Sequence, residues 1–114
     1  MSDCLFCKIA GGEIPAGIVY EDDDMIAFKD ISPVAPVHVL FIPKKHIESL
    51  DTLSSEDAAL AGKILFKAAE YARKEGLAED GYRVINNIGK NGGQTVFHMH
   101  FHLIGGRACT WPPG

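Results

Sequence analysis

A chain of 114 residues, 46% of them hydrophobic, is long enough to form one domain, residues 1–114, with its own apolar core. The net charge of −4 argues against a nucleic-acid polymer as partner, because proteins that bind one usually carry a basic face. A small phosphate ligand stays open, since backbone N–H groups and a few side chains hold one locally.

Cysteine usage and hydropathy indicate the compartment. Three cysteines are an odd number and argue against a secreted disulfide framework. No apolar run approaches membrane-spanning length, and the first residues lack a signal-peptide pattern. We therefore expect a cytoplasmic protein that has no membrane partner.

Short apolar runs between turn residues predict a set of strands. A helical turn over residues 4–10 comes first and ends at Gly11-Gly12. The predicted strands are residues 18–20, 25–28, 37–43, 82–86 and 96–104. The third of these is apolar almost throughout, which is typical of a central strand buried on both faces.

One long helix is predicted between the third and fourth strands. Ser54 is the expected N-cap, with Asp57 at the third helical position, and the helix runs to about residue 75 before Gly76. Its buried stripe repeats every four residues at Leu60, Ile64, Ala68 and Ala72. Antiparallel hairpins with one long helix indicate an α+β fold.

The most informative stretch carries three of the five histidines at two-residue spacing, His98, His100 and His102. On a regular strand these share one face, about 6.6 Å apart, while Phe97, Met99, Phe101 and Leu103 share the other. An ordinary half-buried strand also alternates, but its wet face usually carries Lys, Glu, Thr or Ser. Imidazoles titrate near pH 6.5, so the pattern indicates either a metal site or a histidine nucleophile with helpers.

A metal-dependent hydrolase would need a carboxylate from elsewhere in the chain, because no Asp or Glu follows Arg83. Residues 87–94 form a glycine-rich loop directly before the histidines. Asn91-Gly92 is a good turn sequence, and the alternative is a turn whose N–H groups face an oxyanion.

Residues 98–104 fit the pattern histidine-apolar-histidine-apolar-histidine-apolar-apolar, and through them the chain resembles the histidine triad (HIT) family. Residues 28–33 are similar to the family's nucleoside-binding segment, and residues 36–46 to its central strand. Residues 92–96 precede the triad as they do in that family.

The chain's ending narrows the resemblance. Gly105-Gly106-Arg107 and residues 111–114, Trp-Pro-Pro-Gly, look like the Hint branch, the purine nucleoside phosphoramidases. The resemblance implies a five-stranded antiparallel sheet with one long helix and a short N-terminal helix, continued across a homodimer. It also implies a hydrolase that cleaves the P–N bond of purine nucleoside 5′-phosphoramidates such as adenylyl-lysine.

The resemblance assigns catalytic roles to four residues. His100 becomes nucleotidylylated, His102 hydrogen-bonds the phosphate, and His38 holds the far nitrogen of the nucleophile. Thr95 stands where the family usually has serine and keeps the hydroxyl that would cradle a phosphoryl oxygen.

The resemblance also implies a nucleotide pocket with an apolar base site and a carboxylate, Asp30, for the ribose hydroxyls. Asp30 has a second interpretation, a turn aspartate before Ser32-Pro33. Asn87 matches a family asparagine near the phosphate, but Asn86 precedes it, so which of the two points inward stays open. The nucleotide-binding set is Leu5, Phe6, Ile9, Ile14, Phe28, Asp30, Ile31, Asn87, Gly93, Gln94, Thr95, His100 and His102.

Cys4-x-x-Cys7 alone indicates a redox pair, half of a metal site or two buried thiols. With His46 and His98 it makes a Cys₂His₂ set of the kind that holds structural zinc. Zinc-bearing members of the family, mostly bacterial, have ligands at corresponding places, so we expect Zn²⁺ here and none in the chemistry. Cys109 is expected to be a free thiol.

Two other functions compete. A dinucleoside polyphosphate hydrolase or nucleotidyl transferase of the same superfamily would share His100 as nucleophile. A nucleotide-binding regulatory module would keep the pocket without depending on turnover.

Overall fold

The computed structural model describes residues 3–114, and its elements follow the predicted order. Two helices and five strands lie along the chain, with two short 3₁₀ turns, Leu50–Thr52 and Ser55–Asp57, before the long helix. The elements are α1 (Leu5–Ala10), β1 (Ile18–Glu21), β2 (Met25–Lys29), β3 (Val37–Pro43), α2 (Ala58–Lys74), β4 (Tyr82–Ile85) and β5 (Phe101–Gly105).

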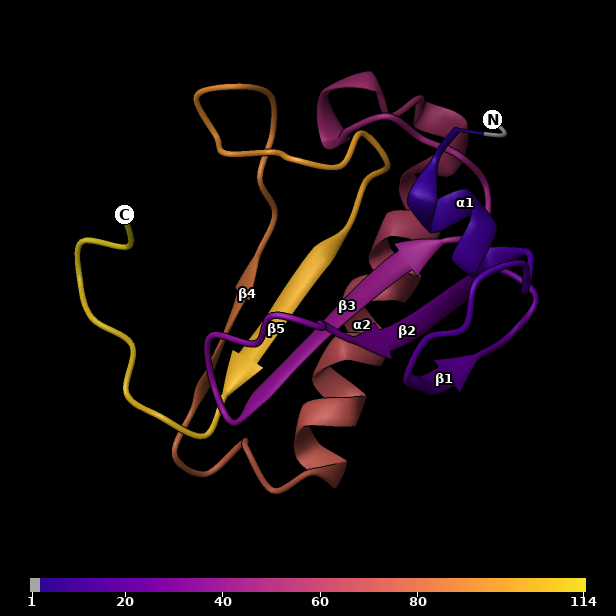
Figure 1. The fold of residues 1–114 in the computed structure, drawn as a ribbon. Helices are drawn as coiled ribbons and strands as arrows, with labels where there is room; N and C mark the ends of the chain where they lie inside the picture. Colours follow the sequence, from indigo (N-terminus) through magenta and orange to yellow (C-terminus); the bar gives the residue numbers. More distant parts are fainter. Residues whose placement is uncertain (1–2) are drawn as a thin grey trace.

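The strands form one antiparallel sheet in the order β1-β2-β3-β5-β4. The long helix α2 covers one face of the sheet and the short helix α1 covers part of the other (Figure 1). The predicted α+β fold with a five-stranded sheet is therefore confirmed.

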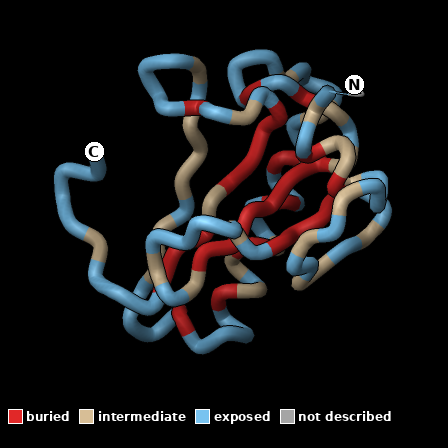
Figure 2. Tube along the Cα trace, viewed as in Figure 1, coloured by how far each residue is buried: buried red, intermediate tan, exposed pale blue. Residues whose placement is uncertain are grey.

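The central strand β3 separates two apolar cores, as its sequence predicted. Val39 and Phe41 pack towards α2, while Leu40 and Ile42 pack towards α1. Figure 2 shows buried chain concentrated along the middle of the sheet, with the connecting loops exposed. His38 follows the alternation and lies on the same side of the sheet as Leu40.

The start of the long helix was predicted three residues too early. Asp57 is the N-cap of α2, and Ser54 instead precedes the 3₁₀ turn without a side-chain cap bond. The Ser54 hydroxyl donates to the Asp57 carboxylate, 3.4 Å away, which Lys45 Nζ also contacts at 2.8 Å. Ile64, Ala68 and Ala72 are buried as predicted, whereas Ala61 takes the buried place expected for Leu60.

The histidine segment is not one regular strand. Residues 96–98 form a bend and β5 begins only at Phe101, so His98 and His100 precede the strand. Phe97, predicted to share a face with buried residues, is 55% exposed. The cause is a contact distant in sequence, because the Met99 N–H donates to the Ile47 carbonyl at 2.6 Å.

Within residues 3–114, no helix combines the length and the apolar character needed to cross a bilayer.

Candidate functional site

A cavity of about 310 Å³ lies between α1, the β2–β3 connection and the segment that leads into β5. It brings together residues far apart in the sequence. The predicted site residues on its walls are Leu5, Phe6, Ile9, Ile14, Phe28, Asp30, Ile31, Thr95, His100 and His102. Its size suits a small organic ligand, with an apolar end near α1 and polar groups at the histidine end.

Helix α1 contributes an apolar wall that also contacts the histidines. The Phe6 ring packs edge-on against Phe28, with ring centroids 5.4 Å apart, and against His100 at 5.0 Å. Both aromatic residues are buried. Phe6 thus closes the cavity floor and restricts the orientation of the His100 ring.

The protonation of His100 follows from its contacts. Its Nδ1 lies 2.7 Å from the His98 carbonyl oxygen, which only accepts, so Nδ1 carries the proton and Nε2 keeps a lone pair. Burial lowers the pKa of His100, although its bond to the His98 carbonyl opposes that effect. His100 is therefore a neutral imidazole whose bare nitrogen is Nε2.

This arrangement corrects the predicted role of His38. The far nitrogen of His100 is held by a backbone carbonyl two residues away, and His38 contacts His102 instead. The bend in residues 96–98 explains the difference, because the His98 carbonyl turns towards the ring of His100.

His38 and His102 form a directed pair on the adjacent strands β3 and β5. The Val34 N–H donates to His38 Nδ1 at 3.1 Å, so the proton of neutral His38 lies on Nε2. His38 Nε2 then donates to His102 Nδ1 at 2.9 Å. His102 consequently presents an Nε2–H donor, which is buried and has no hydrogen-bond partner within residues 3–114.

Asp30 forms the predicted turn and also lies on the cavity wall. Its Oδ1 accepts from the Ser32 N–H at 2.8 Å, which is the expected aspartate turn. Its Oδ2 lies 3.3 Å from His38 Nε2, and the residue lines the cavity. One carboxylate oxygen therefore fixes the loop while the other lies beside the histidine pair.

In the glycine-rich loop, most polar groups serve the turn itself. The N–H groups of Gly93 and Gln94 donate to the carbonyls of Lys90 and Gly89. The buried Gln94 amide accepts from the Gly89 N–H and donates to the Glu48 and Val96 carbonyls. Thr95 is exposed and is the member of the predicted cradle that lines the cavity.

The two asparagines after β4 differ in direction. Asn86 Nδ2 donates to the His100 carbonyl oxygen at 2.8 Å. Asn87 is half-buried and is not on the cavity wall. Asn86 is thus the asparagine whose side chain holds the main chain of the histidine segment.

Sequence reasoning missed several wall residues, which are Pro15, Ala16, Lys29, Leu40 and Val96. Leu40 could have been predicted, because it follows His38 by two residues on a strand and must share its face. Lys29 adjoins Asp30, but no pattern in the sequence indicates that its side chain borders a cavity.

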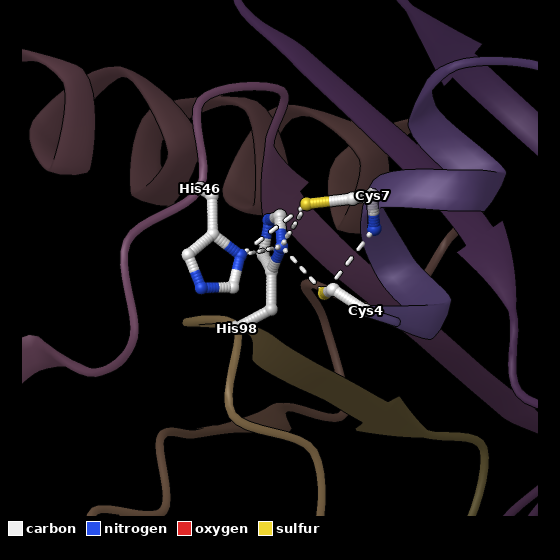
Figure 3. A group of neighbouring side chains, drawn as sticks. All are labelled: Cys4, Cys7, His46 and His98. Carbon is white, nitrogen blue, oxygen red and sulfur yellow. Dashed lines mark hydrogen bonds between the residues drawn. The ribbon is translucent and has the colours of Figure 1, made fainter. Parts of the chain in front are cut away.

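A second cluster joins Cys4, Cys7, His46 and His98, as predicted (Figure 3). Cys4 is the N-cap of α1, Cys7 lies one turn later, and the histidines come from the segments after β3 and before β5. One ligand atom from each residue lies within 4.8 Å of all the others.

The distances fit a tetrahedral metal site. Zinc bonds of about 2.05 Å to nitrogen and about 2.3 Å to sulfur give tetrahedral edges of about 3.3 Å (N–N) and about 3.6 Å (N–S). The two Nδ1 atoms are 3.2 Å apart, and three sulfur–nitrogen distances are 3.3, 3.4 and 3.5 Å. Four of the six donor–donor distances therefore match the edges of a zinc tetrahedron, and all six are within 4.8 Å.

The hydrogen bonds around His98 also suit a ligand. Its Nε2 lies 2.8 Å from the Pro43 carbonyl oxygen, so Nε2 carries the proton and Nδ1 is bare towards the cysteines. Burial lowers the pKa of His98, which keeps the imidazole neutral as metal binding needs.

A third group, Asp30, His38 and His102, is equally compact but does not fit a metal. The His38 nitrogen that faces the other two residues carries the proton, because its other nitrogen accepts from the Val34 N–H. A metal bound to His38 Nε2 would force the proton onto Nδ1, where it would point at the Val34 N–H. The group is a hydrogen-bonded cluster that orients the His102 ring.

The structure is thus an α+β protein with a five-stranded antiparallel sheet, in which a cavity is lined by His100 and by one member of a histidine pair. Comparison with known proteins gives the family: the model of the HIT domain matches residues 11–109. The chain belongs to the HIT domain family.

Relatives of known sequence or structure agree. An uncharacterized HIT-like protein of Synechocystis sp. is 54% identical over 112 residues, which cover 98% of this chain and 97% of that protein. The crystal structure of a HIT family hydrolase from Legionella pneumophila is 54% identical with a TM-score of 0.96, covering 98% of this chain and 100% of that one. A zinc-bound histidine triad family protein from Mycobacterium smegmatis is 35% identical with a TM-score of 0.79, covering 93% of this chain and 76% of that one.

The site predicts an unusual titration of His102. Burial, followed by the neighbouring His100 and His38, lowers its pKa to about 4, so the ring is neutral in the folded protein above that pH. The folded pKa lies below the unfolded value of about 6.5. The stability associated with the neutral ring is therefore complete above pH 6.5 and is lost as the pH falls towards 4.

Ring-nitrogen NMR of ¹⁵N-histidine-labelled protein between pH 7 and 4 measures this directly. The expected result is a His102 midpoint well below 6, with the proton on Nε2 throughout the neutral range. A His102 midpoint at or above 6.5 would contradict the effect of burial, and a proton on Nδ1 of the neutral ring would contradict the hydrogen-bond assignment.

Proposed function

We propose that the protein is a nucleotide hydrolase that cleaves the P–N bond of purine nucleoside 5′-phosphoramidates through a covalent nucleotidyl-His100 intermediate. The observation that carries the proposal is the bare Nε2 of a neutral, buried His100 on a cavity wall that His102 shares. The similar Legionella pneumophila protein described as a HIT family hydrolase supports hydrolysis as the reaction type.

The cavity supports a nucleoside monophosphate as the bound part of the substrate. Apolar side chains from α1 and β2, such as Phe6 and Phe28, would contact the purine base. Asp30 Oδ2 would accept hydrogen bonds from ribose hydroxyls, since its other oxygen is committed to the turn. The phosphate then falls at the end of the cavity where His100, His102 and Thr95 lie.

In the first step, the lone pair of His100 Nε2 attacks phosphorus and the amine departs as the P–N bond breaks. The Nδ1–H stays bonded to the His98 carbonyl, which stabilises the positive charge that develops on the ring. His102 Nε2–H, buried without a protein partner, donates to a non-bridging phosphoryl oxygen. Water then attacks phosphorus, the bond between phosphorus and His100 Nε2 breaks, and the water's proton passes to the solvent. This releases the nucleotide and restores neutral His100.

The His38–His102 pair orients a donor and delivers no proton. His38 Nδ1 accepts from the Val34 N–H, so no further proton donor stands behind the pair. The leaving nitrogen is therefore protonated by water, or is already protonated in the bound substrate and departs as the neutral amine. Asn87, Gly93 and Gln94 support the segments around the phosphate in this proposal and do not contact the reacting atoms.

The first prediction concerns His100→Ala. Removing the nucleophile should reduce turnover of adenosine and guanosine 5′-phosphoramidates by at least about 1,000-fold, while nucleoside monophosphate still binds with a Kd within about threefold of the original. Steady-state kinetics and calorimetric titration with AMP and GMP measure the two effects.

The same substrate panel separates the competing activities. Diadenosine polyphosphates turned over faster than phosphoramidates would favour the polyphosphate hydrolase. Binding without turnover of any nucleotide would favour the regulatory module. Turnover by His100→Ala within tenfold of the unmodified protein would remove His100 as nucleophile.

The Cys4, Cys7, His46 and His98 cluster is proposed as a structural Zn²⁺ site. Closed tetrahedral coordination by two thiolates and two imidazoles leaves no open position for substrate, so the metal takes no part in the chemistry. The donor distances support zinc, as does the zinc-bound relative from Mycobacterium smegmatis. Bound zinc would fasten α1, and with it the base-binding wall, to the catalytic segment.

The second prediction is that protein purified without chelator contains about one equivalent of zinc per chain. Cys4→Ser and Cys7→Ser should lose the metal and lower the Tm by several degrees, because α1 is then held only by apolar contacts. Cys109→Ser is the matched control and should keep both metal and Tm. Less than half an equivalent in the unmodified protein would contradict the site.

A homodimer that continues the sheet across β4 is proposed as the assembly. β4 is an edge strand, and its Val84 is 38% exposed. Other large exposed apolar side chains are Ile88 just after β4, Phe97 before β5 and Trp111 after β5, the last 84% exposed. An exposed strand edge beside apolar side chains favours pairing with a second copy.

The third prediction is a solution mass about twice 12.4 kDa at micromolar concentration, measured by light scattering after size exclusion. Val84→Lys places a charge on the proposed interface and should shift the mass towards the monomer. Ile18→Lys, on the opposite edge strand β1, is the control and should leave the mass unchanged. A monomeric unmodified protein would contradict the proposal.

A further inference from the structure

The main chain of His100 lies just beyond the end of a strand ladder. β4 and β5 pair from Tyr82 with Gly105 to Ile85 with His102, and no further pair follows. The carbonyl of His100 therefore has no backbone donor from β4, although it belongs to the residue whose ring must be placed most accurately.

The side chain of Asn86, the first residue after β4, supplies the missing donor. Its Nδ2 lies 2.8 Å from the His100 carbonyl oxygen. The bond fixes the peptide plane that follows His100 and thereby the direction of its Cα–Cβ bond. The ring is fixed independently, because His100 Nδ1 donates to the His98 carbonyl at 2.7 Å.

The amide oxygen of Asn86, in contrast, lowers the stability of the folded protein. Asn86 Oδ1 is buried without a hydrogen-bond partner within the described chain. A buried acceptor without a partner destabilises the folded protein. An apolar side chain at this position would remove the unpaired oxygen but would leave the His100 carbonyl without its donor. The two costs are similar in size, so what the amide specifically adds is a fixed main chain at His100.

We propose that Asn86 is a positioning residue for the nucleophile, which acts through the His100 carbonyl and does not touch the substrate. The proposal rests on the proposed function, because it assumes that His100 attacks phosphorus. It predicts that loss of the Asn86 donor slows the chemical step while nucleotide binding and stability are retained, because Asn86 is not on the cavity wall.

Two variants test it with different chemistry at similar volume. Asn86→Leu removes the donor and also the orphan oxygen, while Asn86→Asp keeps the shape but turns an acceptor towards the His100 carbonyl. Asn91→Ala, at the exposed asparagine in the neighbouring loop, is the control. The measurements are kcat and KM with adenosine 5′-phosphoramidate, the Kd for AMP, and the Tm.

For Asn86→Leu we expect kcat to fall by about 10- to 100-fold, with KM and the Kd for AMP within about threefold and a Tm within about 3 °C of that of the unmodified protein. Asn86→Asp should lose at least as much kcat. Ring-nitrogen NMR should show a wider spread of His100 environments in both variants. Asn91→Ala should match the unmodified protein.

The outcomes separate this inference from the function on which it rests. If the unmodified protein turns over phosphoramidates and Asn86→Leu keeps kcat within twofold, the positioning role is wrong and the function stands. If kcat falls together with a clear loss of Tm and of AMP affinity, Asn86 has only a structural role, and the positioning role is again wrong. If the unmodified protein has no turnover, the function and the positioning role fail together.

Discussion

The structure depends on His98, which contacts two parts of the site. Its main-chain carbonyl binds the His100 ring, and its side-chain ring belongs to the cluster of cysteines and histidines. Its carbonyl accepts from His100 Nδ1, which leaves Nε2 of that ring bare, and its own ring lies among Cys4, Cys7 and His46. In a regular strand the carbonyl would point sideways to a neighbouring strand, and the ring two residues later could not reach it. The bend in residues 96–98 is therefore what makes the proposed nucleophile.

The site works with neutral groups in fixed orientations. In each histidine ring that faces the cavity, one nitrogen hydrogen-bonds to a protein partner. That bond decides whether the other nitrogen carries a lone pair or an N–H. His100 offers a lone pair and His102 offers an N–H, although burial lowers the pKa of both rings. A preorganised acceptor and donor side by side need little rearrangement when charge develops on a phosphoryl group.

Much of this was predictable from the sequence. Apolar alternation placed β3 between two cores, and the resemblance named most of the residues that line the cavity and the four members of the Cys₂His₂ cluster. The bend, the partner of His38 and the role of Asn86 were not predictable, because each depends on atoms brought close only by the tertiary fold. Met99 N–H bonds to Ile47 and His38 to His102, and no local pattern reports contacts at such separations.

The central claim is that His100 Nε2 forms a covalent bond to the phosphorus of a nucleotide. Rapid acid-free quenching during turnover of an adenosine 5′-phosphoramidate, followed by proteolysis and mass mapping, tests it most directly. The account predicts one adenylyl group on His100 Nε2, formed and lost at rates compatible with kcat. A label on any other side chain, or turnover with no adduct during the first cycle, would contradict it.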